Sequence, residues 1–165
     1  MLTTASIARF LTQPRITVVG ASDSKGSFAG TVYRELKAHG HDVVAVNPHA
    51  QHVDGDPCYP SLASVPGPVG GVLVMINAAD AVGVVRDGLA AGAQHIWLFK
   101  GLGAPGSVSA EAIDLCHEAG VNVVDGACPL MFLEPVGTVH RIHRGLRRLN
   151  GSLKAGSTSQ PNSAA

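Results

Sequence analysis

Residues 16–48 read ITVVGASDSKGSFAGTVYRELKAHGHDVVAVNP, and this stretch decides the fold class. It opens with a β-branched run, 16–20, that stops at a glycine. Apolar residues at helical spacing follow over 28–39, and Gly40 ends that helix. A second apolar run, 42–46, ends at Asn-Pro. The pattern predicts a strand–helix–strand unit whose two strands run parallel.

The same alternation continues along the chain. Further strands are predicted at 71–76, 95–99 and 121–125, and further helices at 4–12, 80–91, 109–119 and 136–149. The strands are apolar on both faces, which is typical of a parallel sheet covered by helices. We therefore predict a doubly wound, Rossmann-like α/β fold, with a mostly parallel sheet of about five strands and helices on both faces. Prolines between residues 48 and 70 predict an irregular crossover, with one short helix near 61–64.

Composition excludes several classes of protein. The 165 residues are 45% hydrophobic and 15% charged, and the twelve basic and twelve acidic residues cancel. A balanced charge disfavours a nucleic-acid partner. No apolar run approaches the roughly 20 residues of a membrane span, and the N-terminus does not resemble a secretory signal. Three cysteines without motif spacing (Cys58, Cys116 and Cys128) favour a reducing, cytoplasmic location.

The two ends of the chain differ from its body. All twelve acidic residues lie at or before Glu134, whereas Arg141, Arg144, Arg147, Arg148 and Lys154 follow it. Residues 151–165 are small and polar, which is typical of a disordered tail. We predict one domain over 1–150 and a tail over 151–165.

The turn after the first strand is the strongest candidate for a binding site. Ligands of such sheets bind outside the carboxyl ends of the strands, near the point where the strand order reverses. Here Gly20 permits a tight turn, and small Ala21 and Ser22 let backbone N–H groups approach an anion. The following helix directs its positive end at the same place, and Lys25 adds a charge. The turn therefore predicts a phosphate site, although a plain strand-to-helix turn has the same pattern.

The turn is not the dinucleotide fingerprint. Ser22 stands where the second glycine of G-x-G-x-x-G belongs, and Asn47 stands where an acidic residue would hold the ribose. Ordinary NAD binding is disfavoured on both counts. The P-loop ending Gly-Lys-Ser/Thr is also missing from this turn.

Several segments together resemble a known family. These are VVGAS at 18–22, VVAVNP at 43–48, YPSLASVPGPV at 59–69 with the strand after it, and GACPLMFLEP at 126–135. They are similar to the CoA-binding domain family, the small Rossmann-like relatives of the N-terminal domain of the succinyl-CoA ligase α subunit. The resemblance covers about residues 7–149. It stops before the ligase's second domain, which carries a phosphorylated histidine, so no ligase activity is implied.

The resemblance implies coenzyme A as the ligand and a position for it. The phosphates would lie at the first turn, the nucleotide would border the Asn-Pro after the second strand, and the end of the third strand would lie against the ligand. In this chain those residues are Gly20, Ala21, Ser22, Asp23, Lys25, Asn47, Pro48, Ile76 and Asn77. Many members carry an arginine in the first turn or after the third strand, where this chain has Lys25 and neutral Asn77.

Other groups of residues are weaker candidates. The glycine-rich loop 100–106 and Cys128 follow later strands on the ligand side, but a flexible loop and a buried or inert thiol are the better explanations. The pairs His140/His143 and His49/His52 offer two metal ligands each, and a site needs more. The basic segment 141–148 is typical of a solvated helix face or a partner contact.

Three functions remain open from the sequence. The first is binding of coenzyme A or an acyl-CoA at the turn after the first strand, without turnover, so no catalytic residue is assigned. The second is an NAD(P)-dependent enzyme on the same fold, and the third is a protein-interaction module that uses the basic helix.

Overall fold

The computed structural model describes residues 3–101 and 106–133. Its helices are α1 (Thr4–Leu11), α2 (Phe28–Ala38), α3 (Ala78–Ala90) and α4 (Ala110–Glu118), with short 3-10 turns η1 (Leu62–Ser64) and η2 (Pro129–Met131). Its strands are β1 (Arg15–Val19), β2 (Asp42–Val46), β3 (His52–Val53), β4 (Asp56–Tyr59), β5 (Gly71–Val74), β6 (His95–Phe99) and β7 (Asn122–Ala127).

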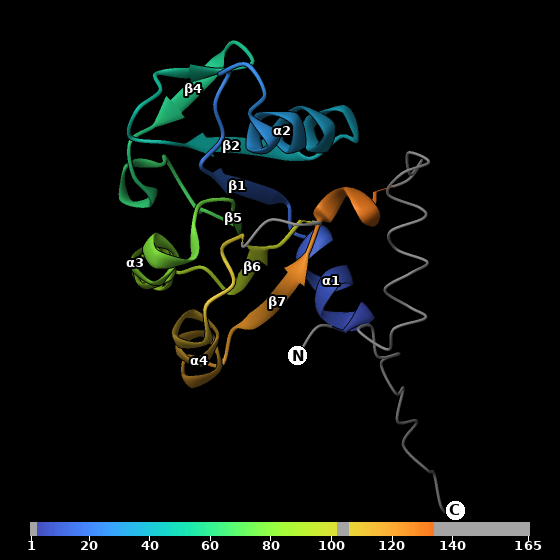
Figure 1. Cartoon of the computed structure of the whole chain (residues 1–165), viewed down its shortest axis with the longest axis vertical. Coiled ribbons are helices and arrows are strands. Elements are labelled where there is room, and N and C mark those ends of the chain that lie inside the picture. Colours follow the sequence, from blue (N-terminus) through green and yellow to red (C-terminus); the bar gives the residue numbers. More distant parts are fainter. Residues whose placement is uncertain (1–2, 102–105, 134–165) are drawn as a thin grey trace, which may run out of the picture.

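The strands form one sheet in the order β3-β4-β2-β1-β5-β6-β7 (Figure 1). Every pair is parallel except β3 with β4, which is antiparallel. The predicted doubly wound sheet is confirmed, with seven strands in place of about five. The order reverses at β1, because β2 lies on one side of it and β5 on the other.

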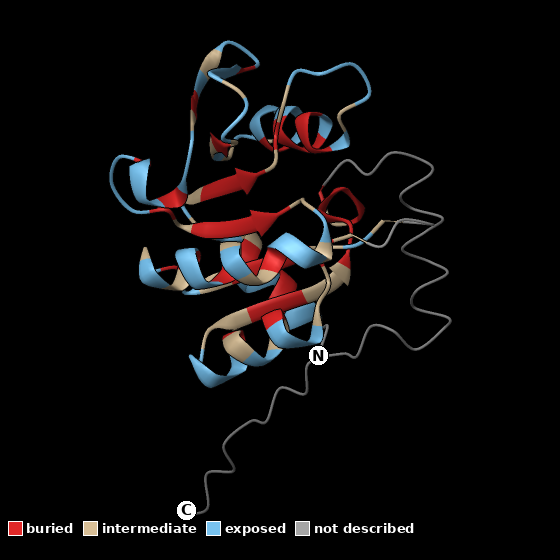
Figure 2. Cartoon of the chain, turned by 60° about the vertical axis from the view of Figure 1, so that its left-hand side comes forward, coloured by how far each residue is buried: buried red, intermediate tan, exposed pale blue. Residues whose placement is uncertain are grey.

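Helices cover both faces of the sheet. In Figure 1, α1 and α2 lie on one side, and α3 and α4 on the other. Alternate strand residues supply two separate cores: Val18 and Trp97 face α1 and α2, whereas Val72 and Ile96 face α3 and α4. Figure 2 shows the strand centres buried and the outer helix faces exposed. Burial on both faces explains why the strand sequences are continuously apolar.

The crossover after β2 contains more structure than the sequence predicts. Besides the expected short helix, it forms β3 and β4, two strands of two and four residues. Pro57 lies within β4, where it pairs with the edge strand β3. Because such short, proline-containing strands have little intrinsic preference for extended structure, they form only where β2 offers a template.

Helix ends differ from the predictions by a few residues. Asn77 caps α3 in place of Asp80, and Thr3 caps α1 in place of Thr4 or Ser6. The predicted helix at 136–149 and the predicted tail at 151–165 lie outside the described residues. Within the described ranges, no helix has the length and apolar character that a membrane crossing requires.

Candidate functional site

The candidate site is the crevice where the chain leaves β1 and β5. These strands are neighbours, but the chain passes from β1 to α2 on one face and from β5 to α3 on the other. Two helix N-termini therefore flank the same edge of the sheet, each with a partial positive charge. This is where an α/β sheet of this kind accepts an anionic ligand.

Gly20 is required by the contact between the two turns. Its φ is +96°, which disfavours any residue with a side chain. A Cβ atom there would lie 2.8 Å from the carbonyl oxygen of Met75 and 2.9 Å from Cγ2 of Ile76. The Gly20 N–H donates to the carbonyl of Val46 at 2.8 Å. Gly20 thus brings the ends of β1, β2 and β5 together.

Ala21 and Ser22 form the part of the turn that packs against the protein interior and α2. Ala21 is fully buried. A Cβ atom on Gly30, in the first turn of α2, would lie 2.1 Å from the carbonyl oxygen of Ser22. The helix can approach the turn so closely only because residue 30 is a glycine. Sequence analysis missed Gly30, although an isolated glycine inside a helical pattern often has such a packing role.

The start of α2 completes the turn. Ser27 caps the helix, and its Oγ accepts from the Gly30 N–H at 3.1 Å. Phe28, Ala29 and Gly30 form the first helical turn beside Ser22. Lys25 is exposed and has no ion pair with the described residues. Its ammonium group is therefore available to neutralise an anion at the turn.

The side chain of Asn47 links the turn after β1 to the turn after β2. Its Nδ2 donates to the carbonyl of Ala21 at 3.0 Å, and its Oδ1 accepts from the His49 N–H at 2.9 Å. The side chain thus fixes the distance between the turn after β1 and the turn after β2. Pro48 follows it and is exposed beside the crevice. The structure brings both predicted residues to the site.

Asp23 also lies in the turn after β1, but its carboxylate is hydrogen-bonded to the turn between β3 and β4. Its two carboxylate oxygens accept from the Asp54 N–H at 3.1 and 2.9 Å. Asp54 has a φ of +53° in the turn between β3 and β4. Arg34 contacts Asp23 at 3.4 Å. The carboxylate therefore holds the β3–β4 turn against the turn after β1.

Ile76 and Asn77 close the other side. Ile76 contacts the position of Gly20, as described above. Asn77 caps α3: its Oδ1 accepts from the Asp80 N–H at 3.0 Å, and its Nδ2 donates to the Asp80 carboxylate at 2.6 Å. Its backbone remains beside the crevice, while its side chain orients the N-terminus of α3.

The loop after β6 is anchored at both of its described ends. Ser107 is fully buried, and its hydroxyl donates to the carbonyl of Val74 at 2.6 Å. Gly106 has a φ of +63°, and a Cβ there would lie 2.2 Å from the carbonyl oxygen of Phe99. Residues 102–105 of the predicted glycine-rich loop lie outside the described ranges.

The remaining candidates do not form a site in the part of the chain that the structure describes. No group of three metal-ligating side chains occurs there, and the pair His140/His143 lies beyond it. Cys58, Cys116 and Cys128 are all buried and form no disulfide. Burial raises the pKa of the Cys116 thiol to about 11 and also raises that of Cys58.

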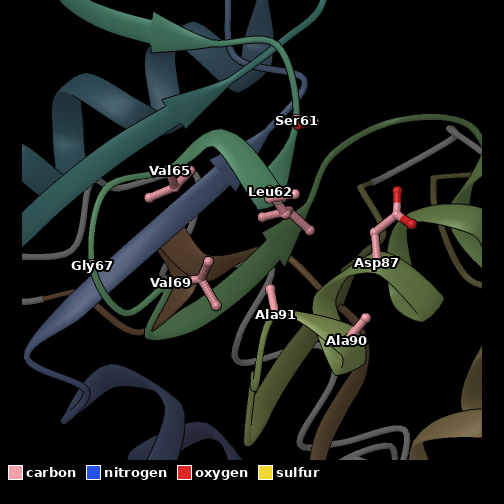
Figure 3. Close-up of a pocket in the computed structure, with 9 residues that line it drawn as sticks. Ser61, Leu62, Val65, Gly67, Val69, Asp87, Ala90 and Ala91 are labelled. Carbon is pink, nitrogen blue, oxygen red and sulfur yellow. The ribbon is translucent and has the colours of Figure 1, made fainter.

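A pocket of about 440 Å³ lies elsewhere, between the crossover and the C-terminal end of α3. Figure 3 shows Leu62 and its neighbours on one side, and Asp87 and Ala90 of α3 on the other. It is at the amino ends of the strands, because Val69 in its wall precedes β5. The pocket is therefore separate from the crevice.

Comparison with known proteins identifies the family of the chain. A family model described as a CoA binding domain matches residues 14–134, which include both turns. The acetate–CoA ligase (ADP-forming) I of Archaeoglobus fulgidus is 33% identical over 63 residues, which are 38% of this chain and 9% of the ligase. The chain thus matches only a small part of that relative's length.

Two solved structures are similar over most of the chain. A hypothetical protein from Pyrococcus horikoshii OT3 has 29% identity and a TM-score of 0.70, over 78% of this chain and 87% of its own. The dinucleotide-forming acetyl-coenzyme A synthetase 1 of Ca. Korarchaeum cryptofilum, in its apo form, has 25% identity and a TM-score of 0.63. That match covers 73% of this chain and 27% of the synthetase.

Proposed function

The chain belongs to the CoA-binding domain family, and from this premise we propose that it binds coenzyme A or an acyl-CoA in the crevice without turnover of its own. The observation that carries the proposal is the close approach of Gly20 to the end of β5. The N-termini of α2 and α3 follow the neighbouring strands β1 and β5 at this edge of the sheet, and Lys25 is exposed in the turn after β1. The diphosphate of coenzyme A would lie there.

The other predicted residues take roles on the two sides of the diphosphate. Asn47 and Pro48 border the nucleotide half, and Asn47 also holds the turn in shape through Ala21. Ile76 and Asn77 border the ligand on the β5 side. Asp23 would support the site by holding the β3–β4 turn, with its charge partly offset by Arg34.

The thiols of Cys58 and Cys116 are assigned no nucleophilic role in this proposal. Cys58 and Cys116 are buried with raised pKa values, which keeps both protonated at neutral pH. A protonated thiol is a poor nucleophile toward a thioester. Three cysteines without disulfides, together with a nucleotide-type ligand, support a cytoplasmic location.

An NAD(P)-dependent enzyme is the second candidate, because the fold is the same. The side chain at the ribose position is Asn47, and both ends of its amide are already hydrogen-bonded within the protein. An acidic side chain is the usual partner of the ribose hydroxyls. Coenzyme A is therefore favoured over NAD.

Calorimetric titration with coenzyme A, acetyl-CoA, ATP and NAD tests the proposal. We expect the two CoA compounds to bind more tightly than NAD, and Lys25→Ala to weaken their binding by about 1–3 kcal/mol, as for loss of a charge-assisted hydrogen bond. Arg86→Ala is the matched control, since it removes the same charge at a pair with Glu111 on the other face. Tighter binding of NAD, or equal coenzyme A affinity in the Lys25 variant, would contradict the proposed site.

A further inference from the structure

Phe28 is the large apolar side chain that the described part of the chain leaves exposed, at 41%. It is the first residue of α2, whereas the later apolar residues of this helix, Val32, Tyr33 and Leu36, are fully buried. Single exposed apolar residues are common and need no explanation by themselves. The position of this one, at the ligand edge of the sheet, is what makes it informative.

The ring of Phe28 packs on that of Phe99. The two centroids are 5.5 Å apart, with an interplanar angle of 40°. Phe99 is the last residue of β6, two strands away from β1. Since neighbouring strands are about 4.8 Å apart, Phe99 lies about 10 Å along the edge from the turn after β1, whereas Phe28 lies beside that turn. The pair extends from the phosphate turn across the end of β5.

Phe99 is held firmly in this position. A Cβ on Gly101 would lie 3.0 Å from its ring, so the backbone of residue 101 lies close against that ring. The N–H of Ser107 donates to the Phe99 carbonyl at 2.8 Å, and Ser107 is fully buried. Phe99 is therefore held in place, and the exposed ring of Phe28 packs on it to form an aromatic platform.

The two sides of the phosphate turn differ in polarity. On the β2 side lie Asn47, His49 and the Asp23–Asp54 contact, which are polar. On the β6 side lie Phe28 and Phe99, which are aromatic. Coenzyme A has the same asymmetry, because a polar nucleotide lies on one side of its diphosphate and the pantetheine arm with its thioester on the other.

We propose that Phe28 and Phe99 form an acyl platform, so that the chain prefers CoA thioesters of apolar acyl groups to free coenzyme A and to thioesters of dicarboxylic acids. This inference rests on the proposed function. Covering an exposed aromatic ring with an aliphatic chain removes apolar surface from water on both partners. A terminal carboxylate would lose its hydration on the same surface without gaining a partner.

Lys100 follows Phe99 and is exposed. Its ammonium group is the charge that would favour a thioester of a dicarboxylic acid over one of an apolar acid. Phe99 faces the α1 and α2 side, together with Trp97. Lys100 lies one residue beyond β6 and is no part of the ring contact between Phe28 and Phe99. The apolar acyl group is therefore the ligand that the platform fits.

The test compares octanoyl-CoA, succinyl-CoA, coenzyme A and adenosine 3′,5′-bisphosphate by calorimetric titration. We expect octanoyl-CoA to bind the native chain about tenfold more tightly than coenzyme A, and succinyl-CoA to show no such gain. Phe28→Ala should abolish the octanoyl gain and leave coenzyme A binding within about twofold. Phe28→Tyr should retain the gain, and Glu35→Ala, an exposed change two turns along the same helix, is the matched control.

The outcomes separate the inference from the proposed function. If no CoA compound binds, the proposed function fails. If coenzyme A binds and octanoyl-CoA gains nothing, or if succinyl-CoA gains equally, the acyl platform alone is overturned. If Phe28→Ala weakens adenosine 3′,5′-bisphosphate as much as octanoyl-CoA, the ring holds the adenine, and the assignment to the acyl group is wrong.

Discussion

Single glycines set the geometry of the crevice. Gly20 and Gly30 each stand where a Cβ would meet a backbone carbonyl at 2.8 Å or less. The turn between them is thus fixed from two directions, by Met75 of the neighbouring strand end and by α2. Substitution of each glycine, compared with a control glycine whose Cβ would meet no atom within 4 Å, tests these contacts.

Gly20→Val should abolish coenzyme A binding and lower the free energy of unfolding by a few kcal/mol, while the domain remains folded. The new side chain would push against Met75 and Ile76 and displace the turn. Gly40→Val is the control, since Gly40 also has a positive φ, +83°, but a Cβ there meets nothing within 4 Å. Thermal unfolding with and without coenzyme A measures both effects. A Gly20→Val protein with the full ligand-induced shift would place the ligand elsewhere.

Gly30→Ala should destabilise the chain and weaken coenzyme A binding, although alanine is the better helix former. The reason is the 2.1 Å approach to the Ser22 carbonyl. Gly83→Ala in α3 is the matched change, because a Cβ there meets nothing within 4 Å. It should stabilise the chain by about 0.5–1 kcal/mol. Urea unfolding compares them, and stabilisation by both changes would refute the contact.

At the scale of elements, α2 connects the site to the β3–β4 ribbon. The Tyr33 hydroxyl donates to the Asp56 carboxylate at 2.9 Å, and Lys37 donates to the same carboxylate at 2.5 Å. Asp23 binds the same, turn end of the ribbon by accepting from the Asp54 N–H. The ribbon thus forms the outer wall of the crevice because a helix and a turn both bind it.

Asp56→Asn should lower the free energy of unfolding at neutral pH by about 0.5–1 kcal/mol, since the ion pair is exposed and screened. The hydrogen bonds from Lys37 and then Tyr33 hold the pKa of the Asp56 carboxyl below its ordinary value of 3.8. Its contribution is therefore complete above that value and is lost as the pH falls through the lower, folded-state pKa. Urea unfolding from pH 7 to pH 2 should show the variant and the native chain converging. Asp114→Asn, at an exposed position of α4, should show no such convergence.

At the scale of the whole molecule, the strand order decides where a ligand can bind. Divergence of the chain at β1 and β5 opens one edge of the sheet, and the N-termini of α2 and α3 flank that edge from the two faces. The pocket at the opposite edge has neither feature. The family match covers residues 14–134, and thus all the elements that build the crevice.

Removal of residues 151–165 should leave both the melting temperature and the coenzyme A affinity unchanged, because the predicted domain ends at 150. Coenzyme A at a hundred times its dissociation constant should stabilise the full and the shortened chain equally, by about 2.7 kcal/mol. Differential scanning calorimetry of the two chains measures this. A lower melting temperature or a smaller ligand effect in the shortened chain would move the domain boundary.

The sequence by itself determined the alternation of strands and helices, since hydrophobic periodicity and glycine stops are local properties of the chain. The strands at 42–46 and 95–99 have the predicted bounds. The turn 20–22 was also identified locally, because small residues between a strand and a helix permit an anion to approach.

Only the tertiary structure decided which residues meet. Four contacts join residues from different elements. They are the pairing of β3 with β4, the hydrogen bond from Asn47 to Ala21, the packing of Gly30 against Ser22 and the ring contact of Phe28 with Phe99. Periodicity specifies which face of an element is apolar, but not which neighbour covers it. Strand order and helix approach settle that, because they depend on how all the buried surfaces pack at once.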